Sequence, residues 1–383
     1  MDRRRFLGVG GLAAASPLLP AMAAGAAPRP HRPAAAVDFA SDGLGLSPPE
    51  YAAVLAEVAA EDGFAADNYS RGGIIRELER RFAQLLGKQD AIYLPTGTLA
   101  NHLAVRKLAG NDRRVLVQAE SHLYNDSGDC AQTLSGLNLV PLAEGSSAFP
   151  VDEVQRWLAR SDSGRVETRV GVIALESPVR RRHHEMVDFD QLARVCSLAR
   201  ERGIRLHLDG ARMFNLPLHS GRPLHAYGAL FDTVYVSLWK HFNAASGAIL
   251  AGDAGFIEGL HHQRRMFGGA LPNAWPAAAV ALRFVDGYLD DYAKSWQVAD
   301  RLMAVLQDDR RFSFEKLPRG TSRFFMTATG VAPDLLRERL AERGVVLSHG
   351  HPETGRFAMQ VNPTLMRTSA EALAGVFVDA IGG

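Results

Sequence analysis

The chain has 383 residues, of which 47% are hydrophobic and 22% are charged, and its formal net charge is only +1. This composition is typical of a globular protein, and the length is enough for one large domain and a smaller one. The near-neutral balance provides no basic surface for a polyanion, so we expect no nucleic-acid partner.

The first 26 residues are similar to an export signal. Arg3-Arg4-Arg5 is followed by a short stretch rich in Gly, Ala and Leu, and then by small residues up to Ala26. This order is typical of a twin-arginine signal peptide, and the apolar run is too short and too rich in Gly to span a membrane. The sequence therefore predicts a periplasmic protein that is exported in the folded state and has no membrane contact after cleavage.

Residues 27–37 are rich in Pro and Ala and are typical of an extended linker. A helix is then predicted after Ser47, an N-cap residue followed by two prolines. A second helix is predicted over residues 73–86, where hydrophobic residues recur at helical spacing before Gly87.

Short apolar runs then alternate with helical patterns. The runs cover residues 91–94, 115–117, 137–142, 170–175, 204–208, 233–238 and 248–251, and the helical patterns include residues 99–109, 151–160 and 189–202. Alternation of this kind predicts an α/β fold with a mostly parallel sheet and helices on both faces. The last run follows its predecessor so closely that we expect it to be an antiparallel hairpin partner.

The C-terminal third predicts a separate, smaller α/β unit. A helical pattern over 256–306 is followed by predicted strands at 312–317, 324–329, 345–348 and 357–361 and by helices at 333–343 and 369–381. We therefore expect a large domain at residues 38–290 and a small C-terminal domain at residues 291–383.

An aspartate and a lysine follow two of the predicted strands. Asp209 ends one strand, in His207-Leu-Asp-Gly-Ala-Arg212, and Lys240 follows the next, in Ser237-Leu-Trp-Lys. Active sites of open α/β sheets lie beyond the carboxyl ends of the strands. A lysine amine forms a Schiff base with the aldehyde of pyridoxal 5′-phosphate, and a carboxylate keeps its pyridine nitrogen protonated. The pair Asp209 and Lys240 thus predicts a pyridoxal phosphate enzyme that acts on amino acids.

A phosphate site is predicted at Thr96-Gly97-Thr98, between a strand and a helix. Glycine lets the backbone approach a phosphate, and the hydroxyl groups and the helix N–H groups can donate to it. Ser237 is a further candidate phosphate donor. An ordinary N-cap turn is the alternative, but the presence of Asp209 and Lys240 in the same predicted sheet favours the phosphate site.

Two further side chains are candidates for the same site. His122 follows the strand at 115–117, and we expect its ring to stack on the cofactor and to assist proton transfer. A surface or capping histidine is the alternative. Arg212 suits a phenolate or carboxylate oxygen, and a salt bridge elsewhere is an equally consistent alternative. Cys130 and Cys196 lie in no CxxC pair and near no His cluster, so no metal site is predicted.

Taken together, these residues resemble the threonine aldolase and aromatic amino acid β-eliminating lyase family of fold-type I pyridoxal phosphate enzymes. The resemblance is carried by Ser41-Asp42, Ile75–Glu79, Leu94–Asn101, Ser121-His122, His207–Asn215, Ser237–Lys240 and Arg264–Gly269. It implies a homodimer or homotetramer and the cleavage of β-hydroxy-α-amino acids to glycine and an aldehyde. It also implies that Ser41, Arg212 and Arg356 lie near the carboxylate of the substrate.

The sequence departs from the family pattern around the substrate. The family has Glu-Asn-Thr-His-Asn after the fifth strand, where this chain has Glu176-Ser-Pro-Val-Arg180, so Val179 stands where the family's histidine recognises the substrate hydroxyl. His183 and His184 follow and are candidate replacements. Other departures are Trp239 for Ser, Arg265 for Lys, 271–273 for Met-Arg-Gln and the displaced carboxylate-binding Arg356.

Three functions are consistent with this sequence. The first is a low-specificity aldolase acting on threonine or an aryl-serine. The second is a β-eliminating lyase that releases ammonia, which fits the loss of the family histidine. The third is a non-catalytic exported protein that binds an amino acid or the cofactor, and the retention of both Asp209 and Lys240 argues against it.

Overall fold

The computed structural model describes residues 36–382. The predicted signal peptide and most of the predicted linker therefore lie outside the described residues. Within them, no helix is both long enough and apolar enough to cross a bilayer.

A seven-stranded sheet forms the centre of the fold, in the order β2-β8-β7-β6-β5-β3-β4. Pairing is parallel from β7 to β4, whereas β8 runs antiparallel to both β7 and β2. The strands are β2 (Asp90–Leu94), β3 (Arg114–Gln118), β4 (Asn138–Leu142), β5 (Val170–Glu176), β6 (Arg205–Asp209), β7 (Thr233–Ser237) and β8 (Ala248–Gly252). This confirms the predicted fold class, including the hairpin partner.

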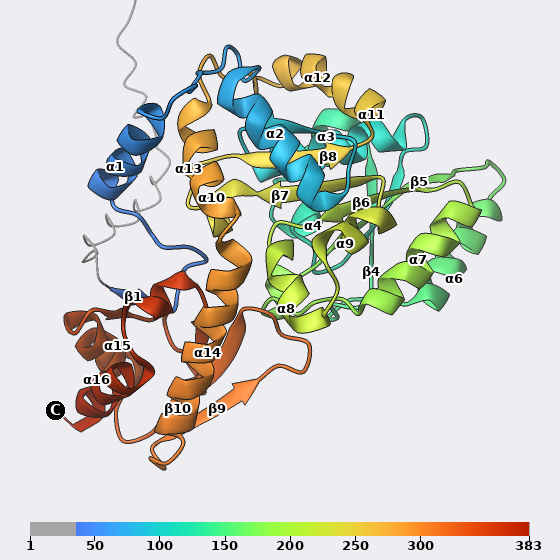
Figure 1. Cartoon of the computed structure of the whole chain (residues 1–383). Coiled ribbons are helices and arrows are strands. Elements are labelled where there is room, and N and C mark those ends of the chain that lie inside the picture. Colours follow the sequence, from blue (N-terminus) through green and yellow to red (C-terminus); the bar gives the residue numbers. More distant parts are fainter. Residues whose placement is uncertain (1–35, 383) are drawn as a thin grey trace, which may run out of the picture. The chain divides into compact units, whose positions relative to one another are not determined.

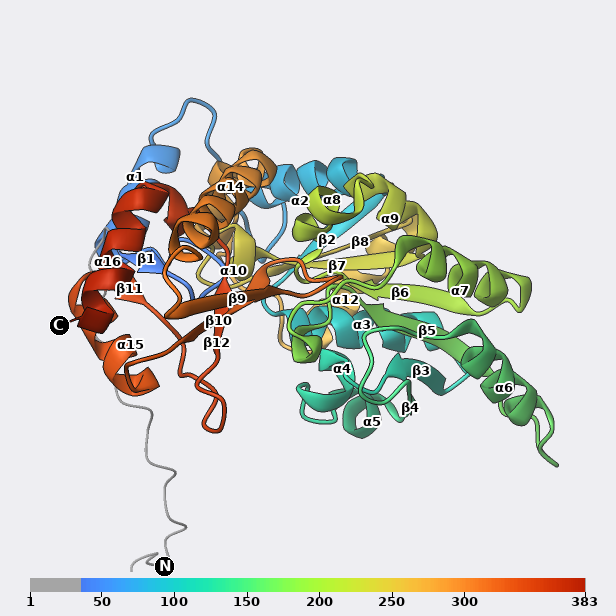
Figure 2. The same ribbon diagram turned by 90° about the horizontal axis from the view of Figure 1, so that it is seen from below.

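Helices cover both faces of this sheet, as predicted. Figure 2 shows α2, α7, α8 and α9 on one face and α3, α4, α5 and α12 on the other. β5 and β7 are buried along their whole length, in agreement with the apolar run of β5 and with the alternate valines of β7. The helices are α1 (Pro48–Ala59), α2 (Gly73–Leu86), α3 (Gly97–Ala109), α4 (His122–Asn125), α5 (Cys130–Ser135), α6 (Val151–Asp162), α7 (Phe189–Glu201), α8 (Leu216–Ser220), α9 (Leu224–Leu230), α10 (Leu238–His241), α11 (Ala254–Glu258) and α12 (Leu260–Met266).

The C-terminal part contains a smaller sheet (Figure 1). Strands β9 (Phe312–Lys316), β10 (Arg323–Ala328) and β12 (Phe357–Gln360) form it in the antiparallel order β12-β10-β9. The helices of this part are α13 (Trp275–Val285), α14 (Tyr288–Leu306), α15 (Pro333–Glu342) and α16 (Ala370–Gly382). The expected domain boundary at 290/291 falls within the first turn of α14. The division of the chain at this point remains a prediction.

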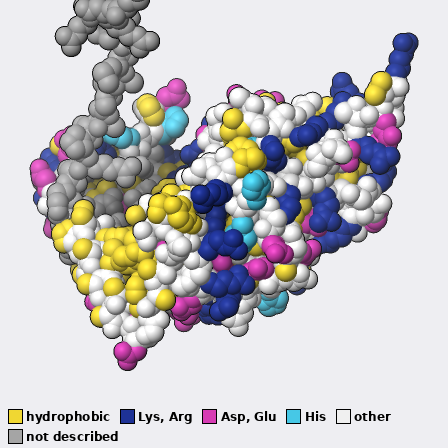
Figure 3. Space-filling view, turned by 90° about the horizontal axis from the view of Figure 1, so that it is seen from above, with side chains coloured by type: hydrophobic (Ala, Val, Ile, Leu, Met, Phe, Trp, Pro, Cys, Tyr) yellow, Lys and Arg dark blue, Asp and Glu magenta, His cyan; other side chains and the backbone are white. Residues whose placement is uncertain are grey.

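One pairing was not predicted from the sequence. β1 (Val37–Asp38) pairs in parallel with β11 (Val345–Val346), so the beginning of the described chain joins its C-terminal part. Ser47 is the N-cap of α1, as predicted, and the structure adds a capping box that was not predicted: the Ser47 side chain accepts from the backbone of Glu50, and the Glu50 side chain accepts from the backbone of Ser47. On the face seen from above, hydrophobic side chains gather to one side and basic side chains lie beside them (Figure 3).

Candidate active site

A cavity of about 330 Å³ lies at the carboxyl ends of β5, β6 and β7. Seven of the ten predicted site residues line it, namely Thr96, Gly97, Thr98, His122, Asp209, Arg212 and Lys240. The wall also includes residues that were not predicted as site residues, among them Glu176, Arg180, Tyr235, Trp239 and Ser246. The structure thus brings together side chains that are more than a hundred residues apart in the sequence.

Thr96 and Gly97 begin helix α3 at one end of the cavity. The Thr96 hydroxyl caps the helix by accepting from the backbone N–H of Leu99 at 3.2 Å. A Cβ on Gly97 would lie 1.9 Å from the hydroxyl oxygen of Tyr235, so no larger residue fits there without movement. A helix N-terminus with such an open backbone is a favourable site for a phosphate group.

Asp209 is held at the end of β6 by a chain of hydrogen bonds. Its Oδ2 accepts from the Nδ2 of Asn101 at 2.6 Å, and its Oδ1 accepts from the backbone N–H of Ala211 at 3.1 Å. The Oδ1 of Asn101 lies 2.9 Å from the Nε2 of His207, whose Nδ1 lies 2.8 Å from the hydroxyl of Thr233. Burial lowers the pKa of His207 to about 4, so the ring is neutral and its Nε2–H orients the Asn101 amide. Asn101 lies one helical turn after Gly97, a spacing that could have indicated a site residue.

Lys240 lies on the short helix α10 and is only 7% exposed. Burial, reinforced by the charge of Arg212, lowers the pKa of its amine to about 8. The Nζ atom lies 5.5 Å from the ring centroid of Trp239, which is half exposed at the cavity wall. An amine with this pKa is partly neutral near neutral pH and is therefore a competent nucleophile.

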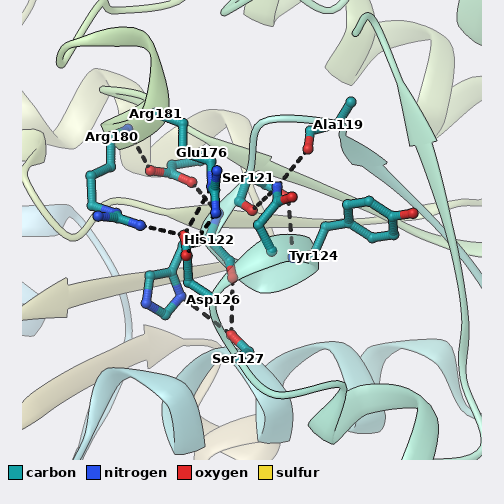
Figure 4. A network of polar contacts seen from close by, with 10 residues as sticks. Ala119, Ser121, His122, Tyr124, Asp126, Ser127, Glu176, Arg180 and Arg181 are labelled. Carbon is teal, nitrogen blue, oxygen red and sulfur yellow. Dashed lines mark hydrogen bonds and ion pairs between the residues drawn. The ribbon is translucent and has the colours of Figure 1, made fainter. Parts of the chain in front are cut away.

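Glu176 connects β5 to His122 (Figure 4). Its Oε2 accepts from the backbone N–H of His122 at 2.6 Å, and its Oε1 accepts from the backbone N–H of Arg180 at 2.8 Å. Burial, with the nearby charge of Asp209, raises the pKa of Glu176 to about 7. Burial also lowers the pKa of His122, so its imidazole is neutral at neutral pH. Glu176 ends a buried strand, as Asp209 does. Its position at a strand end could therefore have predicted that it is a site residue.

Arg212 lies in the cavity wall and also forms a salt bridge. Its Nε and Nη2 donate to the two carboxylate oxygens of Asp42 at 2.9 and 2.7 Å. Burial alone would raise the pKa of Asp42, but the charge and hydrogen bonds of Arg212 hold it far below its usual range. Gln360 donates to the same carboxylate from its Nε2 at 3.2 Å. Asp42 therefore stays ionised and fixes the orientation of the Arg212 guanidinium.

Three predicted site residues lie outside the cavity wall. Ser237 is completely buried at the end of β7. Ser41 uses its backbone oxygen to accept from Asn362 at 2.7 Å. The guanidinium of Arg356 lies 3.5 Å from the ring centroid of Phe325, and its Nη1 lies 3.0 Å from Glu315 Oε2.

The loop after β5, which departs from the family pattern in sequence, keeps Val179 and the candidate residue His184 away from the cavity wall. Val179 is fully buried and does not line the cavity. His184 is likewise fully buried, with its Nδ1 at 2.8 Å from the hydroxyl of Ser322.

Cys130 and Cys196 are both free thiols.

The sheet order and the lysine–aspartate pair define the class of the protein as a fold-type I pyridoxal phosphate enzyme. Comparison with known families agrees, because the model described as beta-eliminating lyase matches residues 38–322. The chain belongs to this family. The predicted family and cofactor are therefore confirmed.

Individual relatives are similar to this chain at modest identity. A low-specificity L-threonine aldolase from Saccharomyces cerevisiae is 28% identical over 207 residues, which are 54% of this chain and 53% of the relative. The chain thus spans about half the length of this relative. Among solved structures, a Listeria monocytogenes protein provisionally assigned as an L-allo-threonine aldolase has a TM-score of 0.74 and 26% identity, with coverage of 89% of this chain and 95% of that one. Serine palmitoyltransferase from Sphingomonas wittichii shares the fold, with a TM-score of 0.65 at 17% identity over 90% of this chain and 86% of that one.

The comparisons contradict the predicted periplasmic location. The matching relatives include eukaryotic low-specificity threonine aldolases, from yeasts and from Arabidopsis thaliana, and no finding points to twin-arginine export or to a periplasmic location. The prediction was based on an arginine triplet followed by small apolar residues. This pattern is short and has low information content, and it lies outside the described residues.

Proposed function

We propose that this protein is a pyridoxal phosphate-dependent aldolase that cleaves a β-hydroxy-α-amino acid to glycine and an aldehyde. The observation that carries the proposal is that Asp209 and Lys240 line one cavity together with the helix N-terminus at 96–98. The low-specificity threonine aldolases among its relatives support this reaction over others of the same fold.

The residues of the cavity fit pyridoxal 5′-phosphate. Thr96, Gly97 and Thr98 would hold the phosphate, because the hydroxyls and helix N–H groups donate and Gly97 leaves the approach open. Asp209 would face the pyridine nitrogen, and Lys240 would bind the aldehyde carbon. When bound, the cofactor supplies an electron sink for the bond that breaks at the substrate Cα.

The remaining side chains would position groups and move protons. His122 is neutral, so a ring nitrogen is free to accept the proton of the substrate hydroxyl as the Cα–Cβ bond breaks. Glu176 would fix the position of His122 through the backbone hydrogen bond at 2.6 Å. Arg212, oriented by Asp42, would direct its remaining N–H groups at the phenolic oxygen of the cofactor or at the substrate carboxylate.

β-Elimination with release of ammonia is the second candidate function. It is favoured by one observation, namely that Val179 occupies the family's histidine position and is fully buried. The hydroxyl of a substrate would therefore lack the partner that this position provides in the family.

One substrate panel distinguishes the two functions. Protein loaded with cofactor is incubated with threonine, phenylserine and other β-substituted amino acids, and glycine, aldehyde, ammonia and keto acid are measured. Glycine with equimolar aldehyde supports the aldolase, whereas ammonia with a keto acid overturns it. Lys240→Ala should abolish every product.

We also propose that the protein is a homodimer or homotetramer. In its support, the helix α1 exposes Ala52, Ala53 and Ala56, and Trp239 is 52% exposed at the cavity wall. A second copy would cover such apolar surface. Light scattering coupled to size-exclusion chromatography tests this proposal, and a monomer at micromolar concentration would contradict it.

A further inference from the structure

Arg180 is a cation of the cavity wall to which the proposed function gives no role. It follows β5 in the stretch where the chain departs from its family, and its backbone N–H donates to Glu176 at 2.8 Å. Its side chain is 41% exposed, compared with 8% for Arg212. Of the two arginines in the wall, Arg180 is therefore the one that remains accessible to a ligand.

The charges around Arg180 leave an excess of positive charge. Arg180 Nη2 lies 2.5 Å from Asp126 Oδ2, and Arg181 Nη2 lies 3.1 Å from Asp126 Oδ1, so two guanidinium groups share one carboxylate (Figure 4). Glu176, the acid of the cavity wall that accepts from the backbone of Arg180, uses both oxygens on backbone N–H groups. Its raised pKa of about 7 also leaves it only partly ionised near neutral pH.

The other cations of the cavity are already engaged. Lys240 would be committed to the cofactor, and Arg212 donates two hydrogen bonds to Asp42. Arg180, by contrast, pairs with Asp126 through Nη2, and its planar guanidinium has a further edge with which to bind a carboxylate.

The position of Arg180 relative to His122 indicates which part of a substrate it would meet. Glu176 accepts from the backbone of both residues, and Asp126, the partner of Arg180, caps the end of the short helix that begins at His122. Arg180 thus lies on the side of the cavity where, in the proposed reaction, the substrate hydroxyl loses its proton. The group beyond the substrate Cβ lies on that side.

We propose that Arg180 binds a carboxylate on the side chain of the substrate, so that the preferred substrates are acidic β-hydroxy-α-amino acids. This inference rests on the proposed aldolase function and specifies its substrate class. With 3-hydroxyaspartate, the Cα–Cβ bond breaks, the hydroxyl proton passes to His122 as the hydroxyl carbon becomes an aldehyde, a proton from His122 or water takes the place of Cβ on Cα, and the products are glycine and glyoxylate.

The test compares kcat/KM for 3-hydroxyaspartate with kcat/KM for threonine in the cofactor-loaded enzyme. The wild type is expected to prefer 3-hydroxyaspartate. In Arg180→Gln, the ratio of the two values should fall roughly 10- to 100-fold, mainly through the KM for 3-hydroxyaspartate, because a charge-assisted hydrogen bond is lost. Arg180→Lys should retain part of the preference.

Arg181→Gln is the matched control, since Arg181 binds the same Asp126, is equally exposed at 42%, and does not line the cavity. Its ratio should change less than about twofold. An unchanged ratio in Arg180→Gln, an equal fall in Arg181→Gln, or a wild type that prefers threonine would overturn the inference. If threonine yields glycine and 3-hydroxyaspartate does not, only this inference fails. If no substrate yields glycine, the proposed function fails with it. Near-ultraviolet circular dichroism confirms that the variants are folded.

Discussion

The two sides of the cavity differ in how the fold holds them. The cofactor side consists of Asp209 and Lys240, which directly follow or end strands of the central sheet, and of the N-terminus of α3. The other side is a loop in which His183 and His184 have positive φ angles of 52° and 63°. Strand ends are fixed by the sheet, whereas this loop depends on contacts such as the Arg180–Asp126 ion pair. In the proposed function, the reaction type therefore depends on the rigid side, and the proposed substrate preference depends on the loop.

Apart from the loss of Lys240 itself, the largest effect is expected where the two sides meet, at His122. The variant His122→Phe keeps an aromatic ring but has no nitrogen to accept a proton. We expect kcat to fall roughly 100- to 10,000-fold, while cofactor affinity changes much less. Steady-state kinetics and a cofactor titration measure the two quantities. If kcat and cofactor affinity fell by the same factor, His122 would act only in binding the cofactor and not in proton transfer.

Asn101→Ala tests the support of the cofactor side. The variant removes the 2.6 Å hydrogen bond to Asp209, and hydrogen bonds to charged groups contribute about 1.5–3 kcal/mol. Cofactor affinity should fall roughly 10- to 100-fold, as measured by absorbance titration. Unchanged affinity would show that Asp209 is held well enough by the sheet alone.

Gly97→Ala tests how closely the phosphate end is packed. A Cβ there would lie 1.9 Å from the Tyr235 oxygen, and overpacking of this kind costs about 1–3 kcal/mol. Thermal unfolding of the apoprotein should show a lower Tm. Gly375→Ala is the control, since this glycine in α16 has open space around its Cβ position, and there the substitution should leave Tm unchanged or raise it.

The smallest predicted effect is a pH dependence of cofactor capture. The neutral amine is the nucleophile, and the pKa of Lys240 is lowered to about 8, so its neutral fraction rises with pH and levels off above that value. Between pH 7 and 9 the capture rate should increase about tenfold and then stay constant. A rate that continues to rise towards pH 10.5 would indicate an unperturbed lysine.

The residues of the rigid side could be predicted from the sequence, because the pattern of apolar runs shows where the strands end. Asp209, Lys240 and His122 could be predicted from their positions after apolar runs, and the structure places all three in one cavity wall. The pairing of β1 with β11 joins residues about 300 positions apart through two-residue strands, which are too short to have a period.

The loop side was less predictable, because side-chain direction in loops is set by tertiary contacts. Arg356 was a candidate for binding the substrate carboxylate because of the family resemblance and because arginine often binds anions, yet its guanidinium packs on Phe325. For Arg180, no sequence pattern predicted a site residue, although its side chain lines the cavity.

Lys240 is the lysine that we propose binds pyridoxal phosphate. Borohydride reduction of the cofactor-loaded protein fixes the cofactor to its lysine, and peptide mass spectrometry identifies the modified residue. We expect one modified peptide, containing Lys240, and none in Lys240→Ala. Modification of Lys88 or Lys107 in its place, or no modification of a visibly coloured protein, would contradict it.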